Sequence, residues 1–297
     1  MNGIINVYKE QGFTSHDVVA KLRGILQMKK IGHTGTLDPD AVGVLPICVG
    51  KATKVVELLT NKDKTYIAKV KCGVQTDTLD MSGEILQTSE QRVTKEEVEQ
   101  VIPEFTGEQQ QIPPMYSAIK VNGKKLYELA RKGETIQRKP RKINIHELSL
   151  LSFDEENQEF EIRVCCSKGT YIRSLCDDIG KKLGCGAAMK ELRRTQVGVF
   201  FAEDALTLDE IQRRKDDGTL EEIFVSIEEM FPDYPKVYVK EDGQKLLENG
   251  NDIPCRFCDA DGVKDGAYVR MYKETEFYAI YQKEERKNKY KTIKMFH

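Results

Sequence analysis

Asp38 is the residue in this sequence best suited to act as a nucleophile or a base. It lies in residues 31–50, IGHTGTLDPDAVGVLPICVG, which hold four glycines, two prolines and His33, one of four histidines in the chain. Glycine permits unusual backbone angles and close approaches, and proline fixes turns. Pro39 biases Asp38 towards extended backbone and holds its carboxylate at a fixed bend. This composition predicts an active-site loop with His33 close to Asp38; a purely structural turn is the alternative.

Other common catalytic patterns are missing from the sequence. Neither glycine-rich phosphate-binding pattern, G-x-x-x-x-G-K-[ST] or G-x-G-x-x-G, occurs. Cys255 and Cys258 form the only C-x-x-C pair, and one pair without a histidine partner indicates a turn rather than zinc. No metal and no cofactor are therefore expected. A single prominent aspartate argues against the paired carboxylates of glycosidases, and a hydrolase would need a water-activating base or a metal set.

Basic residues are concentrated in two segments. The chain carries 46 Lys and Arg against 48 Asp and Glu, a net charge of −2, which argues against a uniformly basic nucleic-acid binder. Residues 120–142 nevertheless hold nine basic and two acidic residues, and the last sixteen residues hold six and two. The two segments indicate localised contact with a polyanion. A solvated charged face is the alternative for either segment alone.

Length and composition indicate a globular protein of about two domains. No apolar run approaches the roughly 18 residues that cross a bilayer. The N-terminus, MNGIINVYKEQG, lacks the basic and apolar zones of a signal peptide. Eight dispersed cysteines fit reduced thiols. A cytoplasmic protein is expected, with no membrane association; no feature indicates an obligate protein interface, so we expect a monomer.

Periodicity and capping residues predict the elements that must position these groups. Helices are expected after the caps Ser15, Thr94 and Thr207, over residues 51–59, from residue 170 and, as a short helix, over residues 187–194. Strands are expected over residues 3–9, 64–74, 143–153 and 160–166. After a linker at residues 231–235, short strands around residues 237–239, 268–271, 277–281 and 291–295 indicate a small β-barrel.

The run GHTGTLDPDAVGVLPICVG resembles the catalytic motif of the TruB family, the bacterial tRNA pseudouridine-55 synthases. Further segments resemble family motifs in family order: residues 8–19, where Glu10 replaces the usual proline, then 64–66, 76–83, 170–175 and 192–198. The resemblance spans residues 4–198, about two-thirds of the chain. It implies that Asp38 is the catalytic aspartate and that His33 is the family's histidine.

The resemblance also implies roles that the residues alone would not give. Tyr66 would stack on the target uracil, although a strand tyrosine is more often a core residue. Arg173 would lie against the aspartate and keep it ionised and oriented, although on its own it suits a surface pair with Asp177. Tyr171 would share the pocket wall with Arg173, and Leu192 would line the uracil pocket.

The fold implied is α/β (α+β), with a mixed, mostly antiparallel central sheet flanked by helices. Residues 1–231 would form the catalytic domain, and residues 235–297 a compact PUA-like RNA-binding domain. The basic residues at about 112–142 resemble the family's thumb insertion, which clamps the T-loop of tRNA. We single out Lys124, Lys125, Lys139 and Arg141 as its substrate-binding residues.

The implied activity is isomerisation of uridine to pseudouridine at position 55 in the T-loop of tRNA. The buried base must be flipped out of the loop before it can react. Asp38 would act at the sugar, either on C1′ as nucleophile or on the C2′ proton as base, and the sequence leaves this choice open. The alternative function is a non-catalytic tRNA chaperone that uses the same cleft.

Overall fold

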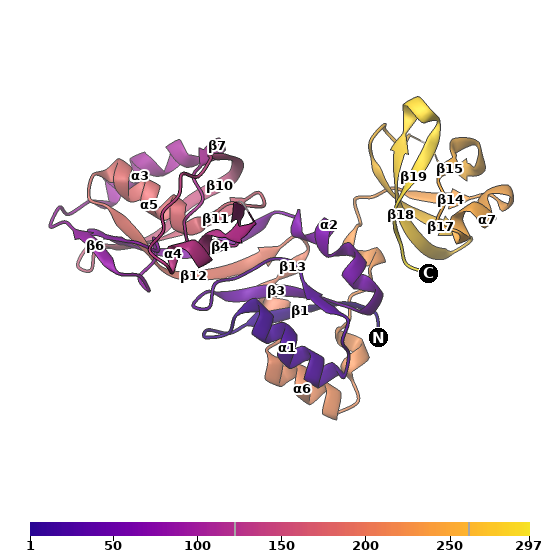
Figure 1. The fold of residues 1–297 in the computed structure, drawn as a ribbon, viewed down its shortest axis with the longest axis horizontal. Coiled ribbons are helices and arrows are strands. Elements are labelled where there is room, and N and C mark those ends of the chain that lie inside the picture. Colours follow the sequence, from indigo (N-terminus) through magenta and orange to yellow (C-terminus); the bar gives the residue numbers. More distant parts are fainter. Residues whose placement is uncertain (122, 261) are drawn as a thin grey trace.

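The computed structural model describes residues 1–121, 123–260 and 262–297, and a nine-stranded sheet runs through its larger part (Figure 1). The strands are β1 (Gly3–Lys9), β2 (Ile31–His33), β3 (Val42–Val49), β4 (Lys64–Cys72), β7 (Gly107–Gln111), β10 (Arg141–Asp154), β11 (Glu159–Cys166), β12 (Ala187–Val197) and β13 (Phe200–Phe201). Their order is β1-β3-β12-β4-β11-β10-β7, with β2 beside β3 and β13 beside β12. Only the β3–β12 pair among these is parallel, which confirms a mixed, mostly antiparallel sheet.

Two groups of helices cover the sheet. Beside β1 and β3, α1 (Ser15–Leu26) packs with α6 (Leu208–Asp216), and their apolar side chains join those of both strands in one core. At the other half, α3 (Lys95–Val101) and α5 (Ile172–Leu183) pack over a second core formed largely by β4, β10 and β11. Thr94 and Thr207 are N-caps with complete capping boxes, as expected. The cap of α1 is Thr14, not Ser15.

Two elements differ from the sequence-based prediction. Residues 187–194 are strand rather than helix, because β12 pairs with β4 along its whole length and this pairing overrides the helix propensity of Ala, Met, Lys and Glu. Residues 31–50 are mostly strand, and only residues 34–41 form the connecting loop. Residues 51–59 are helical, as a 3-10 turn, η1 (Gly50–Val55), followed by α2 (Val56–Thr60).

Smaller elements extend from the sheet. A hairpin joins β5 (Val74–Thr76) to β6 (Ile85–Thr88), and the basic insertion contains β8 (Lys120–Val121), β9 (Lys124–Lys125) and α4 (Leu126–Ala130). The insertion has its own small core around Met115, Leu126 and Leu129. The remaining 3-10 turns are η2 (Ile102–Phe105), η3 (Ala202–Asp204), η4 (Leu220–Ile223), η5 (Glu228–Met230), η6 (Cys255–Phe257) and η7 (Glu285–Lys287).

The C-terminal residues form a barrel-like six-stranded sheet in the order β15-β19-β18-β17-β14-β16 (Figure 1). Its elements are β14 (Lys236–Val239), α7 (Glu241–Glu248), β15 (Ile253–Pro254), β16 (Cys258–Asp259), β17 (Tyr268–Lys273), β18 (Glu276–Glu284) and β19 (Lys289–Met295). The four predicted strands are present, whereas α7 was not predicted. No helix among the described residues has the length and apolarity to cross a membrane.

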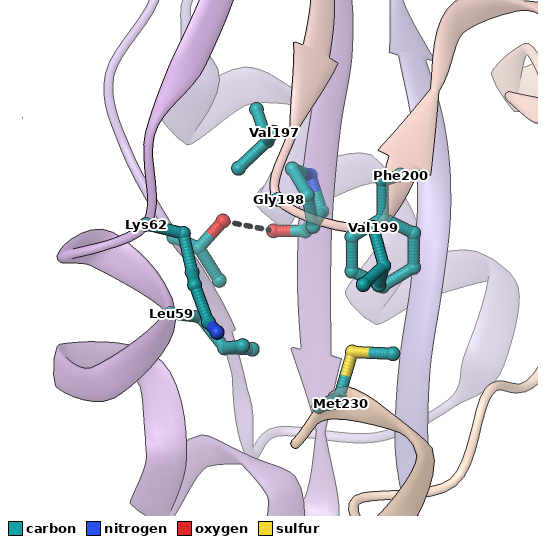
Figure 2. A pocket seen from close by; sticks show the side chains of 9 residues that line it. Leu59, Lys62, Val197, Gly198, Val199, Phe200 and Met230 are labelled. Atoms are coloured by element: carbon teal, nitrogen blue, oxygen red, sulfur yellow. Dashed lines mark hydrogen bonds between the residues drawn. The ribbon is translucent and has the colours of Figure 1, made fainter. Parts of the chain in front are cut away.

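A shared apolar core joins this sheet to the rest of the chain. Ile280 and Phe296 pack in one cluster with Ile4, Val44 and Phe231. Figure 2 shows a pocket beside this cluster, where Leu59 and Met230 face the β12–β13 turn. The linker at residues 231–235 is therefore partly buried, because Phe231 is inside the core.

Helical glycines at two positions give a matched stability test. A Cβ on Gly180 in α5 would lie 2.2 Å from the Ala187 nitrogen on β12, so Gly180→Ala forces the helix off the sheet. We expect it to lower the free energy of unfolding by about 1–3 kcal/mol. Gly24→Ala in α1 meets nothing within 4 Å and should raise it by up to about 1 kcal/mol. Denaturant unfolding measures both, and an equal response of the two variants would contradict the close α5–β12 packing.

Candidate active site

Asp38 is held in the loop between β2 and β3 by hydrogen bonds on both sides. The Leu37 N–H donates to Ser15 Oγ at 2.9 Å, and the fully buried Lys9 donates through Nζ to the Pro39 carbonyl at 3.0 Å. Burial lowers the pKa of Lys9 to about 8. The backbone is thus fixed around Asp38, while 45% of its side chain remains exposed. The carboxylate is rigidly presented to solvent.

Arg173 binds four residues from three other segments of the chain through its guanidinium group. It lies in the first turn of α5 with 8% of its side chain exposed, and its Nη2 is 3.1 Å from Asp38 Oδ2. Its Nη1 is 3.5 Å from Asp80 Oδ2. The same two nitrogens donate to the carbonyls of Thr78 at 3.0 Å and Tyr116 at 2.8 Å. Two carboxylates and two carbonyls therefore fix the orientation of the arginine.

The alternative of a surface arginine paired with Asp177 is wrong. Asp177 pairs instead with Lys181, one helical turn further on, at 2.5 Å. Arg173 was expected off the core side of its helix, but it is buried because the loop after β5 and the basic insertion cover that side.

Three further predicted residues, Tyr66, Leu192 and Tyr171, lie around the ion pair between Asp38 and Arg173. Tyr66 is buried on β4, and burial raises the pKa of its phenol, so the hydroxyl is protonated at neutral pH. Leu192 lies on β12, in register with Ala68. Tyr171 precedes α5, and Gln111 fixes its backbone by bonding its N–H at 2.8 Å and its carbonyl at 3.0 Å.

One cleft, of roughly 1030 Å³ including open solvent, is lined by five of the predicted site residues: Asp38, Tyr66, Tyr171, Arg173 and Leu192. Residues 116–118 of the basic insertion also line it. The structure thus brings together a carboxylate, a paired arginine, two tyrosines and a leucine. These groups can attack or deprotonate a sugar while an aromatic ring holds a planar base.

Comparisons with known proteins identify the family to which the chain belongs. Residues 23–172 match the model of the TruB family pseudouridylate synthase N-terminal domain, and residues 173–231 match that of the tRNA pseudouridylate synthase B C-terminal domain. The chain belongs to the TruB family of pseudouridylate synthases. As a member of this family it is an isomerase, and it converts uridine to pseudouridine.

Individual relatives agree with the family models. A tRNA pseudouridine synthase B of Lachnoclostridium phytofermentans is 52% identical over all of both chains, and one of Bacillus cereus is 50% identical over 84% of this chain and 83% of its own. Among solved structures, a Cbf5-Nop10-Gar1 complex matches with a TM-score of 0.78 and 30% identity. That match covers 99% of this chain and 85% of the other.

Five predicted residues of the TruB-family site lie outside the cleft lining among the described residues. His33 is on β2 with its ring edge-to-face to His16, the centroids 5.2 Å apart, and burial lowers the pKa of its imidazole. The other four belong to the basic insertion and the start of β10. Lys124, Lys139 and Arg141 are exposed and Lys125 is partly so.

Two buried basic residues that line the cleft were not predicted. Arg194 on β12 has 1% of its surface exposed, and it donates to the carbonyls of Val44 at 2.7 Å and Thr36 at 3.4 Å. Lys64 on β4 is also buried, and its Nζ donates to the Thr60 carbonyl at 2.6 Å. The spacing of Lys64 and Tyr66 on one strand face could have revealed the lysine. Arg194 was missed because its strand was predicted as helix.

Gly43 lets the aspartate loop approach β12. Its φ of +107° is unfavourable for other residues, and a Cβ there would lie 2.2 Å from the Arg194 carbonyl oxygen. The parallel bridge between Gly43 and Arg194 therefore requires glycine. This contact sets the β2–β3 loop, which carries Asp38, beside the strand that carries Leu192.

The described residues contain no group of three or more His, Cys, Asp or Glu side chains arranged to hold a metal. All eight cysteines are free thiols, and Cys255 and Cys258 lie at a 3-10 turn, in agreement with the turn interpretation.

Burial of Lys64 should appear in the pH dependence of stability. Burial lowers its pKa from 10.5 to about 8, so between these values the unfolded chain binds more protons than the folded chain. The unfolding free energy of the wild type should therefore rise, relative to Lys64→Met, by up to about 3 kcal/mol from pH 8 to 10.5. Denaturant unfolding across this range measures it. A difference between wild type and Lys64→Met that stays constant across this pH range would contradict the assignment.

Proposed function

We propose that this enzyme forms pseudouridine at position 55 of tRNA, in the T-loop. The observation that carries the proposal is the 3.1 Å pair between Asp38 and the buried Arg173 at a cleft beside Tyr66 and Leu192. The relatives of about 50% identity are named tRNA pseudouridine synthase B, which supports tRNA as the substrate. The assignment to the T-arm rests on the resemblance of the motifs around these residues.

Asp38 is the proposed reactive group. The reaction breaks the N1–C1′ bond, turns the uracil and joins its C5 to C1′, without oxidation or phosphate energy. Asp38 acts at the sugar, on C1′ as nucleophile or on the C2′ proton as base. Arg173 holds one carboxylate oxygen in place, and the 45% exposure of the side chain leaves the group accessible from the cleft.

Tyr66, Tyr171, Leu192 and His33 are proposed to hold the flipped nucleotide. Tyr66 stacks on the uracil, and its neutral hydroxyl can donate a proton or a hydrogen bond. Leu192 and Tyr171 supply the walls of the uracil pocket. His33 lies outside the cleft lining and supports the aspartate loop or occupies the gap left by the flipped nucleotides.

The tRNA is proposed to bind along three parts of the chain. Residues 1–231 form the catalytic domain, residues 112–142 its thumb-like insertion and residues 235–297 a PUA-like RNA-binding domain. Lys124, Lys125, Lys139 and Arg141 contact phosphates. Arg173 donates a hydrogen bond to the carbonyl of Tyr116, and this contact supports coupling between the insertion and the reactive site. The protein acts as a monomer, and its free thiols support a reducing compartment, the cytoplasm.

Incubation with an unmodified tRNA transcript tests the proposal. Chemical mapping of pseudouridine should show one modified position, uridine 55 of the T-loop. A transcript in which that uridine is replaced by cytidine serves as the control and should stay unmodified. Pseudouridine only at other positions, or none at all, would overturn the assignment.

Asp38→Asn separates the isomerase from a tRNA chaperone. The substitution removes the reactive carboxylate but little binding area, so turnover should be lost while tRNA affinity stays within a few-fold. Pseudouridine formation in the tRNA and filter binding measure the two quantities. Turnover above about one-thousandth of wild type would count against the role of Asp38. If the protein is mainly a tRNA chaperone, its tRNA-folding activity should persist in Asp38→Asn.

Neutralising Lys124, Lys125, Lys139 and Arg141 together should weaken tRNA binding. Each lost phosphate contact should flatten the slope of log affinity against log salt by roughly 0.7–0.9. Turnover at saturating tRNA should change much less. The matched control neutralises four exposed basic residues of α1 and α6, namely Lys21, Arg23, Arg213 and Arg214. Equal effects of the two sets, or unchanged binding, would reject the thumb assignment.

A further inference from the structure

Two buried cations of the cleft lack a carboxylate partner among the described residues. Arg194 is 1% exposed and Lys64 is 6% exposed, and both line the cleft. Neither takes part in any ion pair of those residues; their bonds are to backbone carbonyls. One guanidinium nitrogen of Arg194, Nη2, is buried without any hydrogen-bond partner. Uncompensated buried charge is costly, so its retention calls for an explanation.

Asp38, which lines the cleft, and Asp80, which lies outside its lining, are both already engaged. Asp38 and Asp80 both pair with Arg173. Lys64 keeps most of its charge at neutral pH, because its pKa is lowered only to about 8, chiefly by burial. The wall formed by β4 and β12 therefore carries a positive charge that the resting protein does not neutralise.

Tyr66 lies beside this charge on the same wall of the cleft. Arg194 and Tyr66 are directly opposed in the β12–β4 ladder. Burial raises the pKa of the Tyr66 hydroxyl, while the Arg194 charge acts in the opposite direction. The arginine therefore makes Tyr66 a stronger hydrogen-bond donor than burial alone would allow.

The proposed reaction creates negative charge at this position. When the N1–C1′ bond breaks, its electron pair leaves with the uracil, and the charge spreads over N1, O2 and O4. This holds whether Asp38 attacks C1′ or removes the C2′ proton. C5 then bonds to C1′; this displaces Asp38 from C1′ if Asp38 attacked there, or is accompanied by return of the proton to C2′ if Asp38 removed it. The proton on C5 is lost to a base and N1 gains a proton. Atoms and electrons balance without a further reactant.

We propose that Arg194, assisted by Lys64, stabilises the uracil anion during N1–C1′ cleavage by acting through the Tyr66 hydroxyl. Arg194 and Lys64 are thus positioning residues, and Tyr66 is the group that touches the base. The proposal rests on the isomerase function above. The proposal accounts for the two cations without a carboxylate partner. Because their positive charges are already fixed in place, the protein does not have to reorganise when negative charge appears on the uracil.

The dependence of the rate on how well the base leaves tests this proposal. If Arg194 and Lys64 had only a structural role, substituting them would not change that dependence. Fluorine at C5 withdraws electrons and makes the uracil a better leaving group. We would compare single-turnover rate constants, with enzyme in excess, for tRNA transcripts carrying uridine or 5-fluorouridine at the target position. Conversion of the N-glycoside to the C-glycoside is measured after nuclease digestion, with the fluorinated product counted as such.

Arg194→Met should slow the uridine reaction by on the order of 10²-fold and the 5-fluorouridine reaction by clearly less. Lys64→Met should show the same selectivity more weakly. Arg194→Lys keeps the charge and should retain the wild-type ratio of the two rate constants. The control is Arg193→Met, an exposed neighbour on the same strand, which should leave both rate constants within about two-fold.

If Arg194→Met slows both substrates equally, the proposal is overturned and Arg194 has a purely structural role. Unchanged rate constants for both substrates would also overturn the proposal. If Arg194→Met does not fold, Lys64→Met decides by the same ratio. A wild-type enzyme that forms no pseudouridine in tRNA would refute the proposed function itself, which is a distinguishable result.

Discussion

The ion pair between Asp38 and Arg173 is the interaction on which the rest of the site depends. A guanidinium group with 8% exposure needs partners in several directions, and it finds them in three separate segments. Asp38 comes from the β2–β3 loop, Thr78 and Asp80 from the loop after β5, and Tyr116 from the basic insertion. The requirement to satisfy one buried cation thus aligns the reactive carboxylate with the segment proposed to hold the tRNA.

The central sheet makes this convergence possible. Gly43 allows β3 and β12 to run in parallel contact, so the aspartate loop lies next to the strands that carry Leu192 and Tyr66. The same contact buries Arg194 between the β3 backbone and the cleft. The cleft therefore has two kinds of positive charge. Arg173 is neutralised and orients Asp38, whereas Arg194 has no carboxylate partner among the described residues and lines the cleft in which the uracil is proposed to lie.

Much of the fold and of the cleft could be predicted from sequence. The alternation of apolar and polar residues predicted strands β4, β10 and β11, which are present. Five residues that were chosen from local sequence motifs line one cleft. Local signals failed where distant contacts decide. Residues 187–197 have the composition of a helix but complete the sheet, and this error hid Arg194. The burial of Arg173 was also unpredictable, because it depends on chain segments up to 135 residues away, as at Asp38.

Kinetics of Arg173→Lys test the central claim most directly. Lysine keeps the positive charge but cannot contact two carboxylates and two carbonyls at once with a planar fork. The account predicts that kcat for pseudouridine formation falls by at least about 10²-fold while the Kd for tRNA stays within a few-fold. A kcat close to that of the wild type would contradict it, because charge alone would then suffice and the geometry of the pair would not matter.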